Sequence, residues 1–190
     1  LEGFALPGYC RVCDRGVDFQ VDSGHVWRDE GGTYVPDWRE NVRCPGCELN
    51  SRQRMLLTEV IVATQRMRVS GRPFVYALEQ VTRAFACLRD ALPNVELVGS
   101  EFLDASLPGG TIREGIRHEN AEHLSFADGS VDVYVSGDVM EHIADPERAL
   151  AEAARVLRVG GQLFMTAPID LGRDANVTRA KRVDGSIVAL

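Results

Sequence analysis

The sequence predicts an α/β protein with a doubly wound, mostly parallel sheet, preceded by a small cysteine-bearing module. Two observations carry this prediction. From residue 73 onward, apolar runs of strand type alternate with amphipathic helical patterns, which is typical of parallel sheets covered on both faces. Before residue 50, four of the five cysteines form two C-x-x-C pairs. We therefore expect a module over residues 1–50, a bridging helix within 51–70 and an α/β domain over 71–190.

The composition argues against several classes of protein. The chain has 190 residues, of which 45% are hydrophobic and 26% charged, as in ordinary folded domains. No apolar run approaches the roughly 20 residues that span a bilayer, and no signal peptide is visible. A net charge of −7 disfavours a large nucleic-acid surface, because such surfaces rely on Lys and Arg. We expect a cytoplasmic protein that binds neither membranes nor nucleic acids, of unknown oligomeric state.

The cysteine pairs are Cys10 with Cys13 and Cys44 with Cys47. A C-x-x-C turn places two thiolates on one side of a tight loop, and two such turns supply the ligands of a tetrahedral zinc ion. So short a segment buries little core, and a metal cross-link would stabilise it. The alternatives are a disulfide-linked knot, a redox pair and a chance spacing. We expect structural Zn²⁺ in a module resembling a zinc ribbon, with His25 as a bystander.

The bridging helix and the first strands follow this module. The helix begins at the N-cap Asn50 or Ser51 and carries apolar residues at helical spacing up to about residue 67. A second helix should lie between the first two strands and end near Ala91. The four expected strands cover residues 73–79, 94–102, 116–120 and 130–137.

The last elements have local signals of their own. A helix should begin at the cap Asp145 with Pro146 in its first position, and end at Gly160-Gly161. Residues 162–168 form the fifth strand. Asp184-Gly185 lies between two β-type runs within 177–190, which predicts a hairpin. The chain starts with Leu1 and the C-terminal strands of a complete sheet are missing, so we expect a fragment.

Ligands of an open parallel sheet bind outside the carboxyl ends of its strands. Glu101 follows Glu79 by 22 residues, near the usual spacing between a first turn and a ribose-binding acid. Phe102 could cover an adenine ring and Asn120 could pair with its edge, although a core or loop role is the plainer reading of each. The turn at residues 78–80 has no glycine, unlike many nucleotide-binding loops. The candidate cofactor-binding residues are Ala77, Glu79, Glu101, Phe102, Asn120, Ala121 and Ser136.

Residues 117–168, which begin RHENAEHLSF and include DVMEHI and RVLRVGG, resemble the core of class I S-adenosylmethionine-dependent methyltransferases. The stretch CPGCELNSRQR is similar to a subgroup with an N-terminal zinc module. The resemblance implies a Rossmann-like fold that binds S-adenosylmethionine, with Glu101 at the ribose and Asn120-Ala121 at the adenine. Two departures stand out: the glycine loop is missing, and Asn120 replaces a common Asp. Some relatives with the zinc module have an APE-like turn, to which ALE at residues 77–79 is close.

Methyl transfer is an in-line displacement, so the protein mainly aligns the two reactants and excludes water. Asp138 and His142 are the candidates for a base, with a purely structural turn as the alternative. We expect an S-adenosylmethionine-dependent methyltransferase whose acceptor is a small molecule such as a sugar or a natural product. The rivals are a non-catalytic zinc-containing scaffold and a zinc-ribbon nucleic-acid binder, and the acidic charge disfavours the second.

Overall fold

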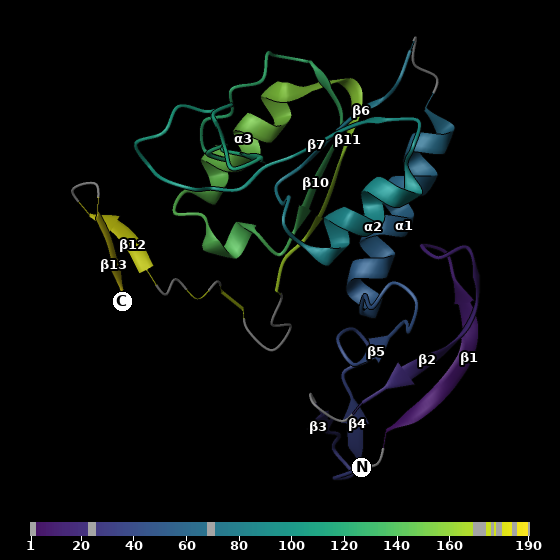
Figure 1. The fold of residues 1–190 in the computed structure, drawn as a ribbon. Coiled ribbons are helices and arrows are strands. Elements are labelled where there is room, and N and C mark those ends of the chain that lie inside the picture. The colour runs from purple at the N-terminus through teal and green to yellow at the C-terminus, as the bar shows by residue number, and fades with distance from the viewer. Residues whose placement is uncertain are drawn as a thin grey trace.

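The structure is a computed structural model that describes residues 3–22, 26–67, 71–168, 174–175, 177, 180–183 and 186–189. A parallel sheet forms its centre, with α1 and α2 on one side and α3 on the other (Figure 1). The cysteine-bearing module lies beyond the N-terminal end of α1. The chain therefore has the expected α/β class, with a doubly wound sheet.

The N-terminal module consists of short antiparallel strands. Strands β1 (Phe4–Cys10), β2 (Arg15–Val21) and β5 (Val42–Arg43) form one sheet in the order β1-β2-β5. Strands β3 (Val26–Arg28) and β4 (Tyr34–Pro36) form a separate pair. This pairing brings the loop between β1 and β2 near the loop after β5, and both loops carry cysteines.

Helix α1 (Ser51–Arg66) connects the module to the sheet. Its N-terminus has a capping box: the Asn50 side chain accepts from the Gln53 backbone N–H at 2.9 Å, and the Gln53 side chain accepts from Asn50 N–H at 3.2 Å. Such a cap stabilises a helix by about 1 kcal/mol. The expected cap at Asn50 is confirmed, and it fixes where the helix begins relative to the metal loops.

The central sheet contains four parallel strands, β6 (Phe74–Ala77), β7 (Glu96–Gly99), β10 (Val131–Gly137) and β11 (Leu157–Thr166), in the order β11-β10-β6-β7. From β6 the chain runs to β7 on one side and later returns to β10 on the other. The connections thus diverge between β6 and β10, which is where open α/β sheets form ligand crevices.

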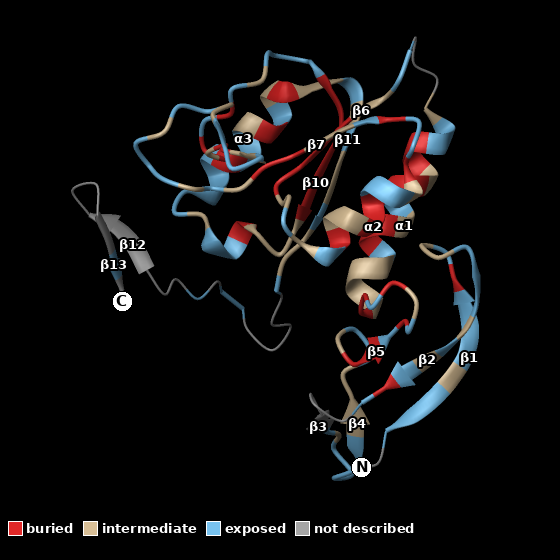
Figure 2. Cartoon of the chain, viewed as in Figure 1, coloured by how far each residue is buried: buried red, intermediate tan, exposed pale blue. Residues whose placement is uncertain are grey.

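Helices cover both faces of this sheet, so its central strands are buried on both sides. Helices α1 and α2 (Arg83–Ala91) pack on the face that carries Val75 and Val133, and α3 (Pro146–Val156) packs on the face that carries Tyr76 and Tyr134. Figure 2 shows the burial concentrated on the central strands and on the helix faces toward them. Residues 131–136 are all buried, as expected for an inner parallel strand.

The strand expected at residues 116–120 is wrong for most of its length. Glu114 and Gly115 both have positive φ, the geometry of a tight hairpin turn, which pairs β8 (Ile112–Arg113) with β9 (Ile116–Arg117). Among the described residues, a single parallel bridge, between Glu101 and His118, continues the main sheet beyond β7.

The expected end of the third helix is also wrong. Helix α3 begins at the predicted cap Asp145 with Pro146 in its first position, but it ends at Val156 instead of at Gly160-Gly161. The Arg155 carbonyl accepts from Gly129 N–H at 2.9 Å, and Leu157 already pairs with Val131 of β10. The two glycines lie at an irregularity inside β11.

Near the C-terminus, β12 (Ala180–Val183) pairs with β13 (Ser186–Ala189), which confirms the hairpin; its turn, Asp184-Gly185, lies outside the described residues. Within the described part of the chain, no helix combines the length and apolarity that crossing a membrane requires.

Candidate functional site

The four predicted cysteine ligands converge on one point. The Sγ atoms of Cys10, Cys13, Cys44 and Cys47 all lie within 4.8 Å of one another. Cys10 Sγ is 3.9 Å from Cys47 Sγ, and Cys13 Sγ is 3.7 Å from Cys44 Sγ. A tetrahedral zinc with Zn–S bonds of about 2.3 Å separates its sulfurs by about 3.8 Å. The arrangement therefore fits a closed four-thiolate metal centre, whereas His25 lies outside the described residues.

The thiols of this cluster differ in acidity. Burial raises the pKa of Cys13 to about 11 and also raises that of Cys47. Burial acts in the same direction on Cys44, but backbone N–H groups of Cys47 and Gly46 outweigh it and lower the pKa of Cys44 to about 7. The Gly46 N–H donates to Cys44 Sγ at 3.3 Å. Cys44 is thus more readily ionised to a thiolate than Cys13 or Cys47.

The loop that carries Cys44 and Cys47 also contacts α2, the helix that follows β6. The Cys47 carbonyl accepts from Arg83 Nε at 3.0 Å and from the Cys87 thiol at 3.7 Å. Arg83 is the first residue of α2, directly after the turn that carries Glu79. The second cysteine pair therefore supports the helix N-terminus beside the candidate cofactor site.

The glycine-free turn after β6 is held by Glu101. One carboxylate oxygen of Glu101 accepts from Gln80 N–H at 2.7 Å and from Val81 N–H at 2.9 Å. The Gln80 side chain also bonds across the site, donating to the Gly115 carbonyl at 2.8 Å and accepting from Arg117 N–H at 2.9 Å. The predicted ribose-binding acid thus adjoins the predicted first turn, and it organises that turn.

Two glycines missed by the sequence reasoning lie against this turn. A Cβ added to Gly99, the last residue of β7, would lie 2.7 Å from the Glu79 carbonyl oxygen. A Cβ added to Gly137, the last residue of β10, would lie 3.0 Å from Glu79 Oε1. The turn has no glycines of its own, and it is instead the glycines of the neighbouring strands that let it lie close against them. The signal available in the sequence was the glycine that ends each of these two strands.

Three carboxylates share this end of the sheet. Burial raises the pKa of Glu79, and the charges of Glu101 and Asp138 raise it further, whereas a hydrogen bond from Thr82 and the charge of Arg52 lower it. Glu79, Glu101 and Asp138 come from the ends of three different strands, as predicted. The cluster is acidic, with one guanidinium beside it.

Asp138 is tied to its surroundings, whereas His142 is exposed. One oxygen of Asp138 accepts from the Thr166 hydroxyl at 2.8 Å, and the other forms an ion pair with Arg52 at 2.6 Å. His142 lies in the short helix η1 (Met140–His142). Ser136 is fully buried, and its hydroxyl has no hydrogen-bond partner among the described residues.

The residues predicted to bind the adenine ring lie close in sequence to the β-bridge between Glu101 and His118. Phe102 is 59% exposed, and its ring lies 5.5 Å from the His118 ring. The side-chain oxygen of Asn120 accepts from Glu122 N–H at 2.9 Å, while Ala121 is buried in the core. Ala77 is also buried, and its carbonyl accepts from the Ser100 backbone N–H at 3.1 Å. Phe102 is thus exposed beside His118, whereas Ala77 packs in the core on the face of α1 and α2 and Ala121 in the core on the face of α3.

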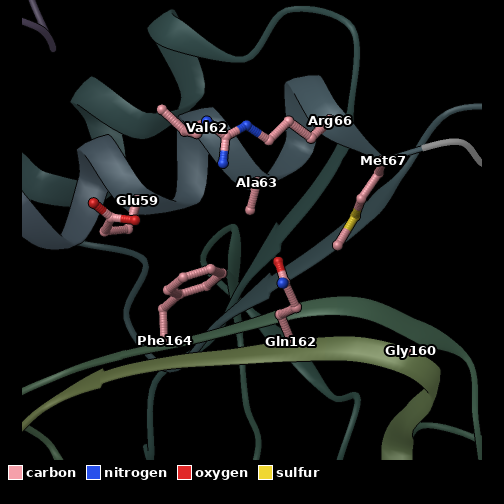
Figure 3. Close-up of a pocket in the computed structure, with 8 residues that line it drawn as sticks. All are labelled: Glu59, Val62, Ala63, Arg66, Met67, Gly160, Gln162 and Phe164. Atoms are coloured by element: carbon pink, nitrogen blue, oxygen red, sulfur yellow. The ribbon is translucent and has the colours of Figure 1, made fainter.

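A separate groove of about 260 Å³ lies between α1 and β11 (Figure 3). Its lining residues are Glu59, Val62, Ala63, Arg66, Met67, Gly160, Gln162 and Phe164. It lies along the C-terminal part of α1, whereas the N-terminal part of α1 contacts the strand ends at Asp138. The groove is therefore not part of the carboxylate site.

Comparison with known proteins finds similarity in the second part of the chain. Residues 73–165 match a protein family described as "Methyltransferase domain". The chain is 44% identical over 64 residues to a chloroplastic 2-methyl-6-phytyl-1,4-hydroquinone methyltransferase of Oryza sativa, covering 34% of this chain and 17% of that protein. It is 43% identical over 56 residues to a probable S-adenosylmethionine-dependent methyltransferase of Mycolicibacterium smegmatis, covering 30% and 22%.

Both relatives are much longer than the matched segment, and the chain covers only about a fifth of their length. Among solved structures, the trans-methyltransferase CalH in complex with S-adenosylhomocysteine aligns at a TM-score of 0.42 and 11% identity, over 63% of this chain and 36% of that one.

Proposed function

Because residues 73–165 match the methyltransferase-domain family, we propose that this chain carries the cofactor site of an S-adenosylmethionine-dependent methyltransferase. We propose further that its acceptor is a small molecule such as a sugar or a natural product. The observation that carries the proposal is the cluster of Glu79, Glu101 and Asp138 at the point where the strand connections diverge. An acidic cluster suits a cofactor that has a sulfonium and an ammonium group.

The residues at the site fit this cofactor in two ways. Gly99 and Gly137 let the turn that carries Glu79 lie close against the strand ends, where an added side chain would clash with it. Glu101 would hold the ribose hydroxyls, and Asn120 with Ala121 would bind the adenine edge. When bound, S-adenosylmethionine supplies an electrophilic methyl group. The protein's own contribution is then to orient the cofactor and the acceptor and to exclude water between them.

Where the acceptor must lose a proton, we propose His142 as the base in preference to Asp138. Both oxygens of Asp138 are already occupied by Thr166 and Arg52, whereas the His142 side chain is exposed in η1, which follows Asp138 in the chain. A histidine is suited to proton transfer near neutral pH. His142→Ala should then lower turnover without weakening cofactor binding.

For the N-terminal module we propose one structural Zn²⁺ bound by Cys10, Cys13, Cys44 and Cys47. The sulfur spacing supports this assignment, because it equals that of a tetrahedral thiolate site. All four cysteines are free thiols, as metal ligands must be, which suits a reducing compartment such as the cytoplasm.

Calorimetric titration with S-adenosylhomocysteine, the cofactor product, tests the proposal. The zinc-loaded wild type should bind one equivalent, and Glu101→Ala should weaken binding by about tenfold or more, since it removes both the ribose contact and the anchor of the turn. Asn120→Ala should weaken it less. Glu59→Ala, in the separate groove, serves as the control and should bind like the wild type. Wild type that binds no cofactor would refute the proposed activity.

One observation favours a second candidate, a non-catalytic zinc-containing scaffold. One oxygen of Glu101 is already used by the backbone of the turn, and this could close the ribose position. The scaffold reading predicts that neither the wild type nor any variant binds cofactor, while the chain still binds zinc and folds. The same titration therefore separates the two candidates.

A further inference from the structure

Arg52 joins three parts of the molecule that lie far apart in the sequence. It belongs to the first turn of α1, and its side chain is only 14% exposed. Its Nε lies 2.7 Å from Glu40 Oε1 in the metal module, and its Nη1 lies 2.6 Å from Asp138 Oδ2 at the end of β10. The same Nη1 reaches the Thr166 hydroxyl at the end of β11, at 3.4 Å. One guanidinium thus connects the metal module to the ends of two strands.

The strand ends are arranged around this contact. Asp138 has a φ of +56°, a left-handed conformation that is unfavourable for a residue with a side chain and that its surroundings must hold in place. Its N–H donates to the Thr166 carbonyl at 3.1 Å, and one carboxylate oxygen accepts from the Thr166 hydroxyl. Arg52 supplies the charged partner of the second oxygen. The position of Asp138 therefore depends on the guanidinium.

The module end of the connection is equally well defined. Both oxygens of Glu40 are occupied: one accepts from Arg52 Nε, and the other accepts from Asn50 Nδ2 at 2.6 Å and from Arg52 Nη2 at 3.3 Å. Paired contacts between a guanidinium and a carboxylate are geometrically specific as well as strong. Glu40 lies in the turn just before β5, and Cys44 directly follows β5, so the position of Arg52 depends on the folded metal module.

The charge of Arg52 also acts on the carboxylate cluster. The positive charge of Arg52 acts against the rise in the pKa of Glu79, and Arg52 forms an ion pair with Asp138 at 2.6 Å. Without Arg52 this end of the sheet would carry these half-buried carboxylates without its positive charge. Such a site tends to rearrange or to take up protons, and either change would remove the negative charge that a cationic cofactor needs.

We propose that Arg52 is a positioning residue for the cofactor site: it couples the metal module, through Glu40, to Asp138 and holds the carboxylate cluster in its binding arrangement. The inference rests on the proposed function, because its main test measures cofactor affinity, and that affinity is what the carboxylate cluster would control. It assigns to the N-terminal module a part in cofactor binding in addition to its own stability.

Arg54 provides a matched control within the same helix turn. Its guanidinium donates to the carbonyls of Val42 and Leu49, at 2.8 and 2.6 Å, and so also ties α1 to the module. None of its described contacts is with the strand ends. Arg52→Gln and Arg54→Gln therefore each remove an attachment of the module to α1, and only Arg52→Gln removes the link to Asp138.

The test compares cofactor affinity among Arg52→Gln, Arg52→Lys, Glu40→Gln and Arg54→Gln, using S-adenosylhomocysteine as the probe. Zinc content and thermal unfolding are measured on each protein. Arg52→Gln should lose about tenfold in affinity, equivalent to about 1.4 kcal/mol, with its zinc content unchanged. Arg52→Lys should recover part of the loss, because it keeps the charge without the paired geometry. Glu40→Gln should show an intermediate loss, and Arg54→Gln should stay within about twofold of the wild type.

Two results would overturn the inference. One is an Arg52→Gln variant that binds the probe as tightly as the wild type. The other is an Arg54→Gln variant that loses as much affinity as Arg52→Gln, because any attachment of the module would then have the same effect. If Arg52→Gln does not fold, Arg52→Lys and Glu40→Gln decide by the same criteria.

Amide hydrogen exchange needs no cofactor, so it distinguishes a failure of the proposed function from a failure of the positioning role of Arg52. The Asp138 N–H bonds to Thr166, so its exchange reports the arrangement that Arg52 holds. It should exchange about tenfold faster in Arg52→Gln than in Arg54→Gln. If the wild type binds no cofactor, the proposed activity is refuted, and the exchange rates of the Asp138 amide in the two variants then test the positioning role. Equal rates in the two variants would overturn that role.

Discussion

Replacing Gly99 by alanine should disturb the candidate cofactor site through the backbone. The added Cβ would lie 2.5 Å from Phe85 Cε2 and 2.7 Å from the Glu79 carbonyl oxygen, whereas carbon atoms pack at about 3.5–4.0 Å. The Phe85 ring can tilt away, but the carbonyl can move only if the turn moves. That turn donates the Gln80 and Val81 N–H groups to Glu101, so both hydrogen bonds should lengthen.

The magnitude follows from two opposing effects. Overpacking a filled interior costs about 1–3 kcal/mol, and replacing glycine by alanine returns about 0.4–1 kcal/mol by restricting the unfolded chain. We therefore expect Gly99→Ala to lower the free energy of unfolding by about 1–2 kcal/mol. Because the turn shifts, the affinity for S-adenosylhomocysteine should fall by about tenfold.

Urea unfolding followed by circular dichroism, together with calorimetric titration, measures both quantities. Gly16→Ala is the matched control, since Gly16 also lies in a strand and its added Cβ would meet nothing closer than 3.9 Å. That variant should stay within about 0.5 kcal/mol of the wild type and keep its cofactor affinity. If Gly99→Ala behaves like Gly16→Ala in both assays, the account of how this turn is accommodated is wrong.

Three further predictions concern the metal and the ionisable groups. Purified protein should contain about one zinc per chain, and Cys44→Ser or a chelator should lower the unfolding temperature, because the module has little core of its own; an unchanged melting curve would contradict a structural metal. Because burial raises the pKa of Glu79 in the folded state, its contribution to stability is greatest at low pH. That contribution is lost as pH rises from the ordinary pKa of a glutamate to the raised one. Glu79→Gln should therefore flatten stability against pH in that window, and an identical slope in the variant would exclude the effect. A hydrogen bond from Arg155 lowers the pKa of Glu152 to about 2, so Glu152 stabilises the fold above its unfolded pKa and this stability is lost as pH falls toward 2. Glu152→Gln should cost about 1 kcal/mol at pH 7 while the exposed Glu147→Gln costs nothing measurable, and equal unfolding energies would count against the pairing.

The features that the sequence predicted correctly depend on local signals. Asn50 and Asp145 cap their helices through hydrogen bonds to residues three positions later, so the signal and the structure lie in one short segment. The buried strands are apolar runs with turn residues at their ends. The four cysteines could be assigned for the same reason, because each C-x-x-C pair forms its half of the site within one loop.

The features that were missed depend on contacts between distant segments. Nothing near Arg52 in the sequence indicates that it pairs with Asp138, because that pairing exists only once α1 packs across the sheet. Gly99 and Gly137 matter only because Glu79 lies between their strands. The wrong end of α3 has a similar origin: pairing of Leu157 with Val131 extends the chain before the two glycines that would ordinarily stop a helix.

The central claim is that the turn held by Glu101 binds the cofactor without glycines of its own. Backbone amide NMR of the zinc-loaded chain during titration with S-adenosylhomocysteine tests it most directly. The account predicts the largest shifts at the amides of Gln80 and Val81, which donate to Glu101, with residues 120–121 also shifting and Val62 in the separate groove unchanged. Saturating ligand that leaves Gln80 and Val81 unshifted would contradict the claim.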